Sequence, residues 1–465
     1  MTYKESALYR ILLNTHTVTA HSRIYAAMSR DLSLFSRKRF FYTLIHIYIT
    51  FNHKTMSLSY DSAFTKRNLG IDMLRAFTML TMIFVNDFWK VHGVPHWLEH
   101  ADVYEDFMGL ADVVFPCFLF AVGMSIPYAI ENRYAKGKSA ESTIGHILSR
   151  ALSLIVMGTF LGNSEARVGG DCPYPIGVYW LLMVIGIIGV WNSYPRTQSH
   201  RGKMLIKASK CIGAAILIYL ILSFRNKNGG VFSPYSSILG LIGWTYLVCA
   251  VTYYFCRNNI KRIATVWGVF VAISIVTSPL RDCLGGQALL HFPENNFYEG
   301  MLSILHIENG SHIVLTMSGM LLSLLSVHFD SRSYAWKLST AFATSAVFVA
   351  LGIVAHHFWI LSKIWATPTW VCFIIAISVA MYAVLHFLDR HNLTRWFAII
   401  RPAGTATLTA YLMPYVFYAC SSLTGITLPD CLTHGIVGIA NCLCFSLVVI
   451  TCTGILERLH IKLKV

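Results

Sequence analysis

Long apolar runs alternate with short polar segments along most of the chain. A helix needs about twenty mostly apolar residues to cross a bilayer, and runs close to that length recur from residue 69 to residue 455. The pattern predicts an all-α, polytopic integral membrane helix bundle of about 11–12 transmembrane helices, eleven if a weak run such as 263–279 is re-entrant. The expected spans are 69–91, 108–130, 145–163, 176–192, 204–223, 237–256, 263–279, 311–328, 338–359, 370–388, 404–423 and 433–455.

Residues 1–55 do not follow this pattern. They are rich in polar and basic residues, and their longest apolar run, 40–51, is too short to span a bilayer and contains a histidine. They also lack the ordered basic, apolar and small-residue regions of a secretory signal. We interpret 1–55 as an N-terminal extension, untranslated or disordered, with Met56 as the initiator, and 56–465 as the transmembrane domain. A cytoplasmic amphipathic tail is the alternative interpretation of 1–55.

Composition supports a membrane protein. Of the 465 residues, 55% are hydrophobic and 13% are charged, whereas a soluble domain carries about 25% charged residues. The formal net charge of +15 does not indicate nucleic-acid binding, because no basic helix or stripe lies outside the expected spans. The 12 cysteines show no CxxC pair and no Cys/His ligand spacing, so we expect no metal site.

Lysine and arginine concentrate in alternate loops, which indicates an orientation. The intervening loops hold few basic residues, namely Arg167, Arg225, Lys227, Arg281 and Lys363. The positive-inside rule places the basic loops in the cytoplasm. With an even number of spans both termini are then cytoplasmic, and the acidic loop 92–107 and the long loop 280–310 lie outside.

Several polar residues lie within the first two expected spans. Asp72 and Arg75 are three residues apart and so share a helix face. They are either a structural pair that satisfies itself or part of a functional site, because a charge inside a membrane helix costs several kcal/mol and usually marks function. In the second span Asp112 lies four residues before Pro116, which predicts a broken helix beside a buried carboxylate. Such an arrangement suits a substrate pocket.

His100 lies in the expected outer loop between these two spans. A histidine in a loop is usually only solvated. Imidazole is nevertheless the side chain that titrates near neutral pH, so His100 is the best candidate for acid–base chemistry in this sequence. Gly123 and Ser125, further along the second span, favour close packing of helices.

Four short motifs carry a resemblance to a known family. They are GIDMLRAF at 70–77, FVN at 84–86, HA at 100–101 and ADVVFPCFLFAVG at 111–123. Together they resemble the heparan-α-glucosaminide N-acetyltransferase family of transmembrane acyltransferases, whose pattern is D-x-x-R-G, F-V-N, H-A and D-L-V-F-P-x-F-x-F-x-x-G. The chain departs from that family at 177–182, which lacks a Gln-Arg pair, and at Ala406, where the family has asparagine.

The resemblance implies residue roles. Its catalytic residues would be His100 on the outer side, Asn86 as hydrogen-bond donor to an oxyanion, and Asp112 as the residue that orients His100 or holds the acceptor amine. His100 would deprotonate the amine or form a short-lived acyl-histidine, and the sequence leaves both routes open. The residues implied for the acyl donor, acetyl-CoA, are Asp72, Arg75, Arg133 and Arg150, and those implied for the acceptor are Lys363 and Trp370.

The leading hypothesis is therefore an acyl-CoA-dependent N-acetyltransferase. It would move an acetyl group from cytosolic acetyl-CoA to the amine of an extracytoplasmic amino sugar, such as a glucosamine at a glycan end. The alternatives are a transporter or flippase for a glycan or acyl group, and a scaffold with an inactive site. We expect location in a bacterial inner (plasma) membrane, contact with lipid and a small-molecule or glycan acceptor. A homodimer stays open, because lipid-facing and partner-facing surfaces look alike in sequence.

Overall fold

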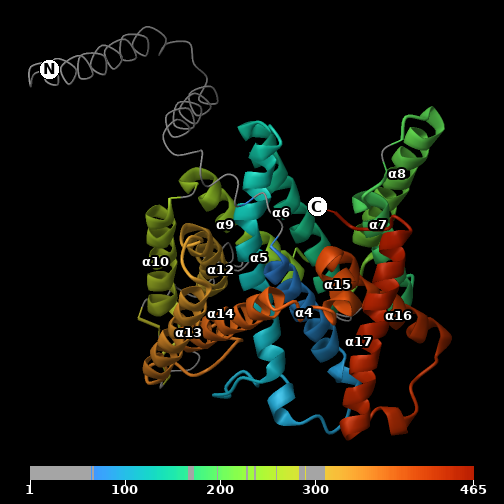
Figure 1. The fold of residues 1–465 in the computed structure, drawn as a ribbon. Helices are drawn as coiled ribbons and strands as arrows, with labels where there is room; N and C mark the ends of the chain where they lie inside the picture. The colour runs from blue at the N-terminus through green and yellow to red at the C-terminus, as the bar shows by residue number, and fades with distance from the viewer. Residues whose placement is uncertain are drawn as a thin grey trace, which may run out of the picture. The chain divides into compact units, whose positions relative to one another are not determined.

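Each apolar run expected to span the membrane is helical in the computed structural model (Figure 1). The structure describes residue 64 and residues 68–165, 172–195, 197–226, 229–234, 237–257, 259–281, 288–289 and 309–464. The extension predicted at 1–55 lies outside these residues. The helices are α4 (Leu69–Asn86), α5 (Leu110–Ala135), α6 (Ala140–Glu165), α7 (Ile176–Trp191), α8 (His200–Ser223), α9 (Ile238–Cys256), α10 (Ile260–Thr277), α12 (Ser311–His328), α13 (Tyr334–His356), α14 (Pro368–Arg390), α15 (Phe397–Thr405), α16 (Thr407–Thr424) and α17 (Gly435–Arg458).

Ten helices in the described part of the chain are long and apolar enough to cross a membrane. This confirms a polytopic helical membrane protein, with ten such spans rather than the expected 11–12. The helix α7 is shorter, with 16 residues, and α16 is not among the ten. The weak run at 263–279 forms the continuous 18-residue helix α10, which is one of the ten candidate spans. The orientation in the membrane stays a prediction from loop charge.

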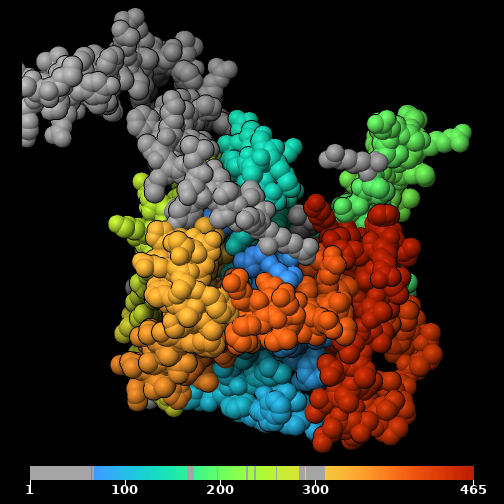
Figure 2. All heavy atoms as spheres, viewed as in Figure 1, coloured from blue at the N-terminus to red at the C-terminus, as the bar shows by residue number. Residues whose placement is uncertain are grey.

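Helix α4 occupies the centre of the bundle. It packs against α5, α14, α15, α16 and α17, and neighbouring helices cover most of it in Figure 2. Asn68 caps its first turn by accepting a hydrogen bond from the Ile71 amide at 3.3 Å. The Asn68 side chain also donates to the hydroxyls of Tyr128 on α5 and Tyr382 on α14, both at 3.1 Å. This cap therefore fixes the start of α4 to two neighbours.

Two glycines bring α5 and α12 into backbone contact. A Cβ atom at Gly123 would overlap the Thr316 carbonyl oxygen, and one at Gly319 would overlap the Phe120 carbonyl oxygen. Small residues at such a crossing let membrane helices approach closely. The structure thus confirms the packing predicted for Gly123. Ser125 differs, because its hydroxyl bonds within α5 to the Ala121 carbonyl at 2.9 Å and its side chain lines a cavity.

Helix α5 runs unbroken from Leu110 to Ala135 with Pro116 and Pro127 inside it. The expectation of a broken helix at Pro116 is therefore wrong. The hydrogen bond that Pro116 cannot donate would have gone to the carbonyl of Asp112, four residues earlier. The indole Nε1 of Trp370, on α14, donates to that carbonyl instead, at 3.3 Å. Because a neighbouring side chain satisfies the carbonyl, the helix tolerates the proline.

Candidate active site

The carboxylate of Asp112 organises the site from the first turn of α5. Its Oδ2 accepts hydrogen bonds from the amides of Gly109, at 3.2 Å, and Ala101, at 2.9 Å. Gly109 is required here, because a Cβ atom would overlap the Glu99 carbonyl oxygen of the preceding loop. Asp112 itself is only 2% exposed. Backbone amides and the helix N-terminus both favour a negative charge at this position.

The second oxygen of Asp112 holds the imidazole of His100. Its Oδ1 lies 2.7 Å from His100 Nδ1, while half of the His100 side chain stays exposed. The carboxylate can only accept, so we assign the ring hydrogen to Nδ1. The other nitrogen, Nε2, then carries a lone pair. An imidazole held in this way has the orientation that a general base or a nucleophile requires.

Lys363 joins His100 and Asp112 from the loop between α13 and α14. Its Nζ lies 3.0 Å from His100 Nδ1 and 3.4 Å from Asp112 Oδ1. Burial lowers the pKa of Lys363, and the adjacent Asp112 carboxylate opposes that shift. One of the two residues implied for the acceptor thus lies against two of the three residues implied for catalysis.

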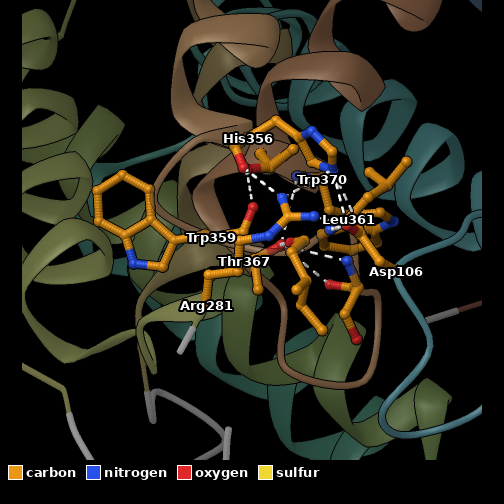
Figure 3. A network of polar contacts seen from close by, with 10 residues as sticks. Asp106, Arg281, His356, Trp359, Leu361, Thr367 and Trp370 are labelled. Carbon is orange, nitrogen blue, oxygen red and sulfur yellow. Dashed lines mark hydrogen bonds and ion pairs between the residues drawn. The ribbon is translucent and has the colours of Figure 1, made fainter. Parts of the chain in front are cut away.

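A second carboxylate ties the His100 loop to the Lys363 loop (Figure 3). Asp106 accepts the Leu361 amide at 2.7 Å, His356 Nε2 at 2.8 Å and Arg281 at 2.7 Å. Partial burial opposes ionisation, but the Leu361 amide, His356 and Arg281 outweigh it and lower the pKa of Asp106. We call Asp106, Arg281, His356 and Leu361 the Asp106 clasp.

Of the two other residues implied at this end, Trp370 contacts Asp112 and Asn86 has no hydrogen bond to the cluster among the described residues. Trp370 is fully buried, and its indole supports the Asp112 carbonyl. Asn86 is the last residue of α4, and its side chain is exposed. Among the described residues, no hydrogen bond joins it to His100 or Asp112. The next residue, Asp87, is buried and pairs with Lys90 at 2.8 Å and with the Tyr418 hydroxyl at 2.9 Å.

A cavity of about 560 Å³ lies toward the opposite ends of α4 and α5. The α4 residues that line it are Asp72, Arg75, Met79 and Met82. These positions recur every three or four residues, and Asn86 continues the same helix face. The cavity also receives Arg150, Lys462 and Lys464. Its volume lies in the range of small-molecule and cofactor sites.

Three of the four residues implied for the donor line this cavity, namely Asp72, Arg75 and Arg150. Asp72 and Arg75 form the ion pair that their spacing predicts, at 2.6 Å. Arg133 is not a lining residue, and its guanidinium bonds to the carbonyl and hydroxyl of Ser142 at 2.9 and 3.1 Å. Arg150 stacks on Tyr246, with 4.8 Å between its guanidinium carbon and the ring centre.

Sequence reasoning missed three residues of these sites. Asp106 was visible only as part of an acidic loop, and nothing in the sequence indicates its contact with Leu361. Lys462 and Lys464 were visible only as basic residues after the last span. Their spacing of two on a short tail after a helix gives no sign that the tail folds back to the cavity.

Comparisons with known proteins agree with the motifs. A family model described as a domain of unknown function, DUF5009, matches residues 67–279. Heparan-alpha-glucosaminide N-acetyltransferase from Homo sapiens is 30% identical over 109 residues, which are 23% of this chain and 16% of the human protein. The chain is thus similar to a small part of that enzyme. The two matches support the relationship to the heparan-α-glucosaminide N-acetyltransferase family that the motifs suggest.

Proposed function

We propose that the chain is a membrane-embedded acetyltransferase that uses acetyl-CoA and acetylates the amine of an amino sugar. The observation that carries the proposal is the half-exposed imidazole of His100, oriented by the buried Asp112 carboxylate at 2.7 Å. A buried carboxylate behind an accessible imidazole is an arrangement suited to acyl transfer. The distant similarity to an N-acetyltransferase suggests the same class of reaction.

The chemistry follows from the tautomer of His100. In direct transfer, Nε2 removes a proton from the acceptor amine while the amine nitrogen bonds to the acyl carbon and the carbon–sulfur bond breaks. The thiolate leaves and takes up a proton. In the second route, Nε2 itself bonds to the acyl carbon while the carbon–sulfur bond breaks and the thiolate leaves. The amine nitrogen then bonds to the acyl carbon, the bond from that carbon to Nε2 breaks, and Nε2 takes up the proton of the amine. Asp112 stabilises the positively charged ring in both routes.

Asn86 is proposed to donate a hydrogen bond to the negatively charged oxygen that forms on the acyl carbon. Its exposed side-chain amide lies at the end of the α4 face that lines the cavity. Loss of such a donor typically costs about 3 kcal/mol of barrier stabilisation. Lys363 would contact the acceptor, because its ammonium lies beside His100.

The cavity is the proposed donor site. Among the described residues, four basic side chains line it, Arg75, Arg150, Lys462 and Lys464, against the one carboxylate of Asp72. This excess of positive charge fits the phosphates of coenzyme A, and the Met79 and Met82 side chains provide an apolar wall beyond them. The Nε atom of Arg150 is buried without a hydrogen-bond partner among the described residues, so this donor would suit an anionic group.

The test is turnover by the detergent-purified protein supplied with acetyl-CoA and glucosamine, with mass spectrometry of the sugar. We expect N-acetylated product from the wild type and at least a hundredfold lower rate from His100→Ala. The matched control is His357→Ala, because His357 is exposed and has no hydrogen bond to His100, Asp112 or Lys363 among the described residues. Full activity of His100→Ala would refute the catalytic assignment.

The transporter alternative predicts a different result. A cavity inside a helix bundle also suits a transported molecule. Vesicles containing the protein would then move labelled amino sugar across the membrane without coenzyme A. Neither the wild type nor His100→Ala would form acetylated product.

A further inference from the structure

Lys363 brings a primary amine of the protein against the imidazole of His100. Its Nζ lies 3.0 Å from His100 Nδ1, and no other lysine hydrogen-bonds to His100 in the described part of the chain. The Lys363 side chain is 22% exposed, so it is not sealed inside the protein. The reaction proposed above acetylates an amine at this histidine, and the fold itself places an amine there.

The hydrogen-bond geometry favours a neutral amine at Lys363. With the ring hydrogen on His100 Nδ1, an ammonium group would bring a second donor against it at 3.0 Å, and two donors cannot bond to each other. A neutral amine has a lone pair that can accept this hydrogen. The carboxylate partner of the ammonium form, Asp112 Oδ1, lies at 3.4 Å, which is longer than an ordinary hydrogen bond. The site therefore stabilises the ammonium less than a close ion pair would.

Burial acts on Lys363 in the same direction. It lowers the pKa of Lys363, and the Asp112 carboxylate opposes this shift without cancelling it. Near neutral pH a larger fraction of Lys363 is consequently a neutral amine than of an exposed lysine. Only the neutral amine can bond to an acyl carbon, and enzymes that use lysine as a nucleophile desolvate it for this reason.

We propose that Lys363 is itself an acetyl acceptor, and that the protein acetylates this lysine when no amino sugar is bound. The inference rests on the function proposed above, because the acetyl group comes from acetyl-CoA. Nζ bonds to the acyl carbon, the carbon–sulfur bond breaks and the thiolate leaves. His100 Nε2 removes the proton that Nζ gives up and passes it to the thiolate, so the products are acetyl-lysine and coenzyme A. The flexible stem of the lysine lets Nζ move from the Nδ1 side of the ring to the acyl group.

Acetylation of Lys363 stops further turnover in this scheme. An acetylated lysine has no charge, so Asp112 loses its ammonium partner. The acetyl group also takes up space beside His100, where the amine of the sugar is proposed to bind. A protein supplied with acetyl-CoA but with no amino sugar would thus inactivate itself.

The experiment incubates the detergent-purified full-length protein with acetyl-CoA and no sugar, and measures acetyl-lysine at each position by peptide mass spectrometry. Lys337 is the matched control within the same molecule, because it also pairs with a carboxylate, Asp330 at 2.7 Å, and its side chain is 28% exposed. We expect an acetylated fraction at Lys363 about tenfold or more above that at Lys337, and a fall of about tenfold or more in His100→Ala. Equal fractions at the two lysines would overturn the proposal, as would a fraction at Lys363 that His100→Ala leaves unchanged.

Loss of activity is a second measurement, which does not depend on the folding of His100→Ala. Preincubation of the wild type with acetyl-CoA should progressively lower its rate of sugar acetylation, and glucosamine present during the preincubation should prevent this loss. Lys363→Arg keeps a positive charge but cannot form acetyl-lysine, so its own initial rate should be the same before and after preincubation. An equal decline in wild type and Lys363→Arg would show that another group is modified.

The two proposals fail in different ways. Acetylated sugar from a protein whose Lys363 stays unmodified without sugar supports the proposed reaction and refutes self-acetylation. Acetyl-lysine at Lys363 that depends on His100, without any acetylated sugar, supports self-acetylation and refutes the amino sugar as acceptor.

Discussion

The ammonium of Lys363 and the imidazole of His100 share one oxygen of Asp112, at 3.4 and 2.7 Å. One buried carboxylate therefore has two roles, since it orients the ring and is also the counter-ion of a lysine whose side chain is 22% exposed. A change at Asp112 is consequently expected to affect both the proposed reaction and the stability of the fold, and a second substitution can separate the two effects.

Asp112→Asn is expected to reduce the rate of acetyl transfer by at least a hundredfold, because the amide no longer stabilises a charged ring. It should also lower the free energy of unfolding by about 3 kcal/mol, because Lys363 loses its counter-ion. Adding Lys363→Met should restore part of the stability and none of the activity. Thermal unfolding and turnover of the single and double variants measure both effects, and a double variant less stable than Asp112→Asn would contradict this account.

The Asp106 clasp predicts a pH-dependent contribution to stability. The pKa of Asp106 is lowered in the folded protein, so its ionised form contributes stability above its unfolded value of about 3.9. That contribution is lost as the pH falls through the lower folded value. We expect Asp106→Asn to melt below wild type at pH 7, and the difference to narrow as the pH falls below about 4. An equal difference at pH 7 and pH 3 would argue against the clasp.

Asp106→Asn should also lower kcat, since the clasp connects the loop of His100 to the loop of Lys363. A displacement of about 1 Å at a reacting group can cost about a hundredfold in rate. The matched control is Asp330→Asn, because Asp330 also pairs with a basic residue, Lys337 at 2.7 Å, but is exposed and distant in the fold from this loop pair. Equal activities of the two variants would show that the clasp has no positioning role.

Trp370 and Pro116 are predicted to be thermodynamically coupled. Trp370→Phe removes the donor to the Asp112 carbonyl and should destabilise the protein by about 1–3 kcal/mol, the cost of an unsatisfied buried acceptor. In the background Pro116→Ala the new amide can donate to the same carbonyl, so Trp370→Phe should then cost less. A double-mutant cycle by thermal or denaturant unfolding measures the coupling, and strict additivity would exclude it.

The crossing of α5 and α12 predicts a large effect of a single methyl group. Gly319→Ala should destabilise the protein by about 1–3 kcal/mol, because its Cβ atom meets the Phe120 carbonyl oxygen. Gly145→Ala is the matched control, since a Cβ atom there, also within a helix, meets nothing within 4 Å. Melting temperatures that fall equally in both variants would contradict the packing described here.

The sequence predicted the helices well, because a bilayer leaves the backbone few alternatives to a helix. It also indicated the ion pair of Asp72 and Arg75, which depends only on helical spacing. Contacts between distant segments were less accessible. Lys363 reaches His100 only because the loops that carry them meet, and Trp370 compensates for Pro116 from another helix. The prediction of a broken helix at Pro116 was wrong for this reason, since the continuity of the helix depends on a side chain more than two hundred residues away.

The face of α4 that lines the cavity also sets the distance between the proposed phosphate site and the proposed site of acyl transfer. Arg75 and Asn86 are eleven positions apart on it, which corresponds to roughly 16 Å of helix at about 1.5 Å per residue. If Arg75 binds the phosphates and Asn86 contacts the acyl group as proposed above, the donor must carry its acyl group on an arm of about this length. Acetyl phosphate, in which the two groups are directly bonded, is too short to contact both ends at once. The length of this helix face would thus select activated acyl donors by the distance between their phosphates and their acyl group, whatever acyl group they carry.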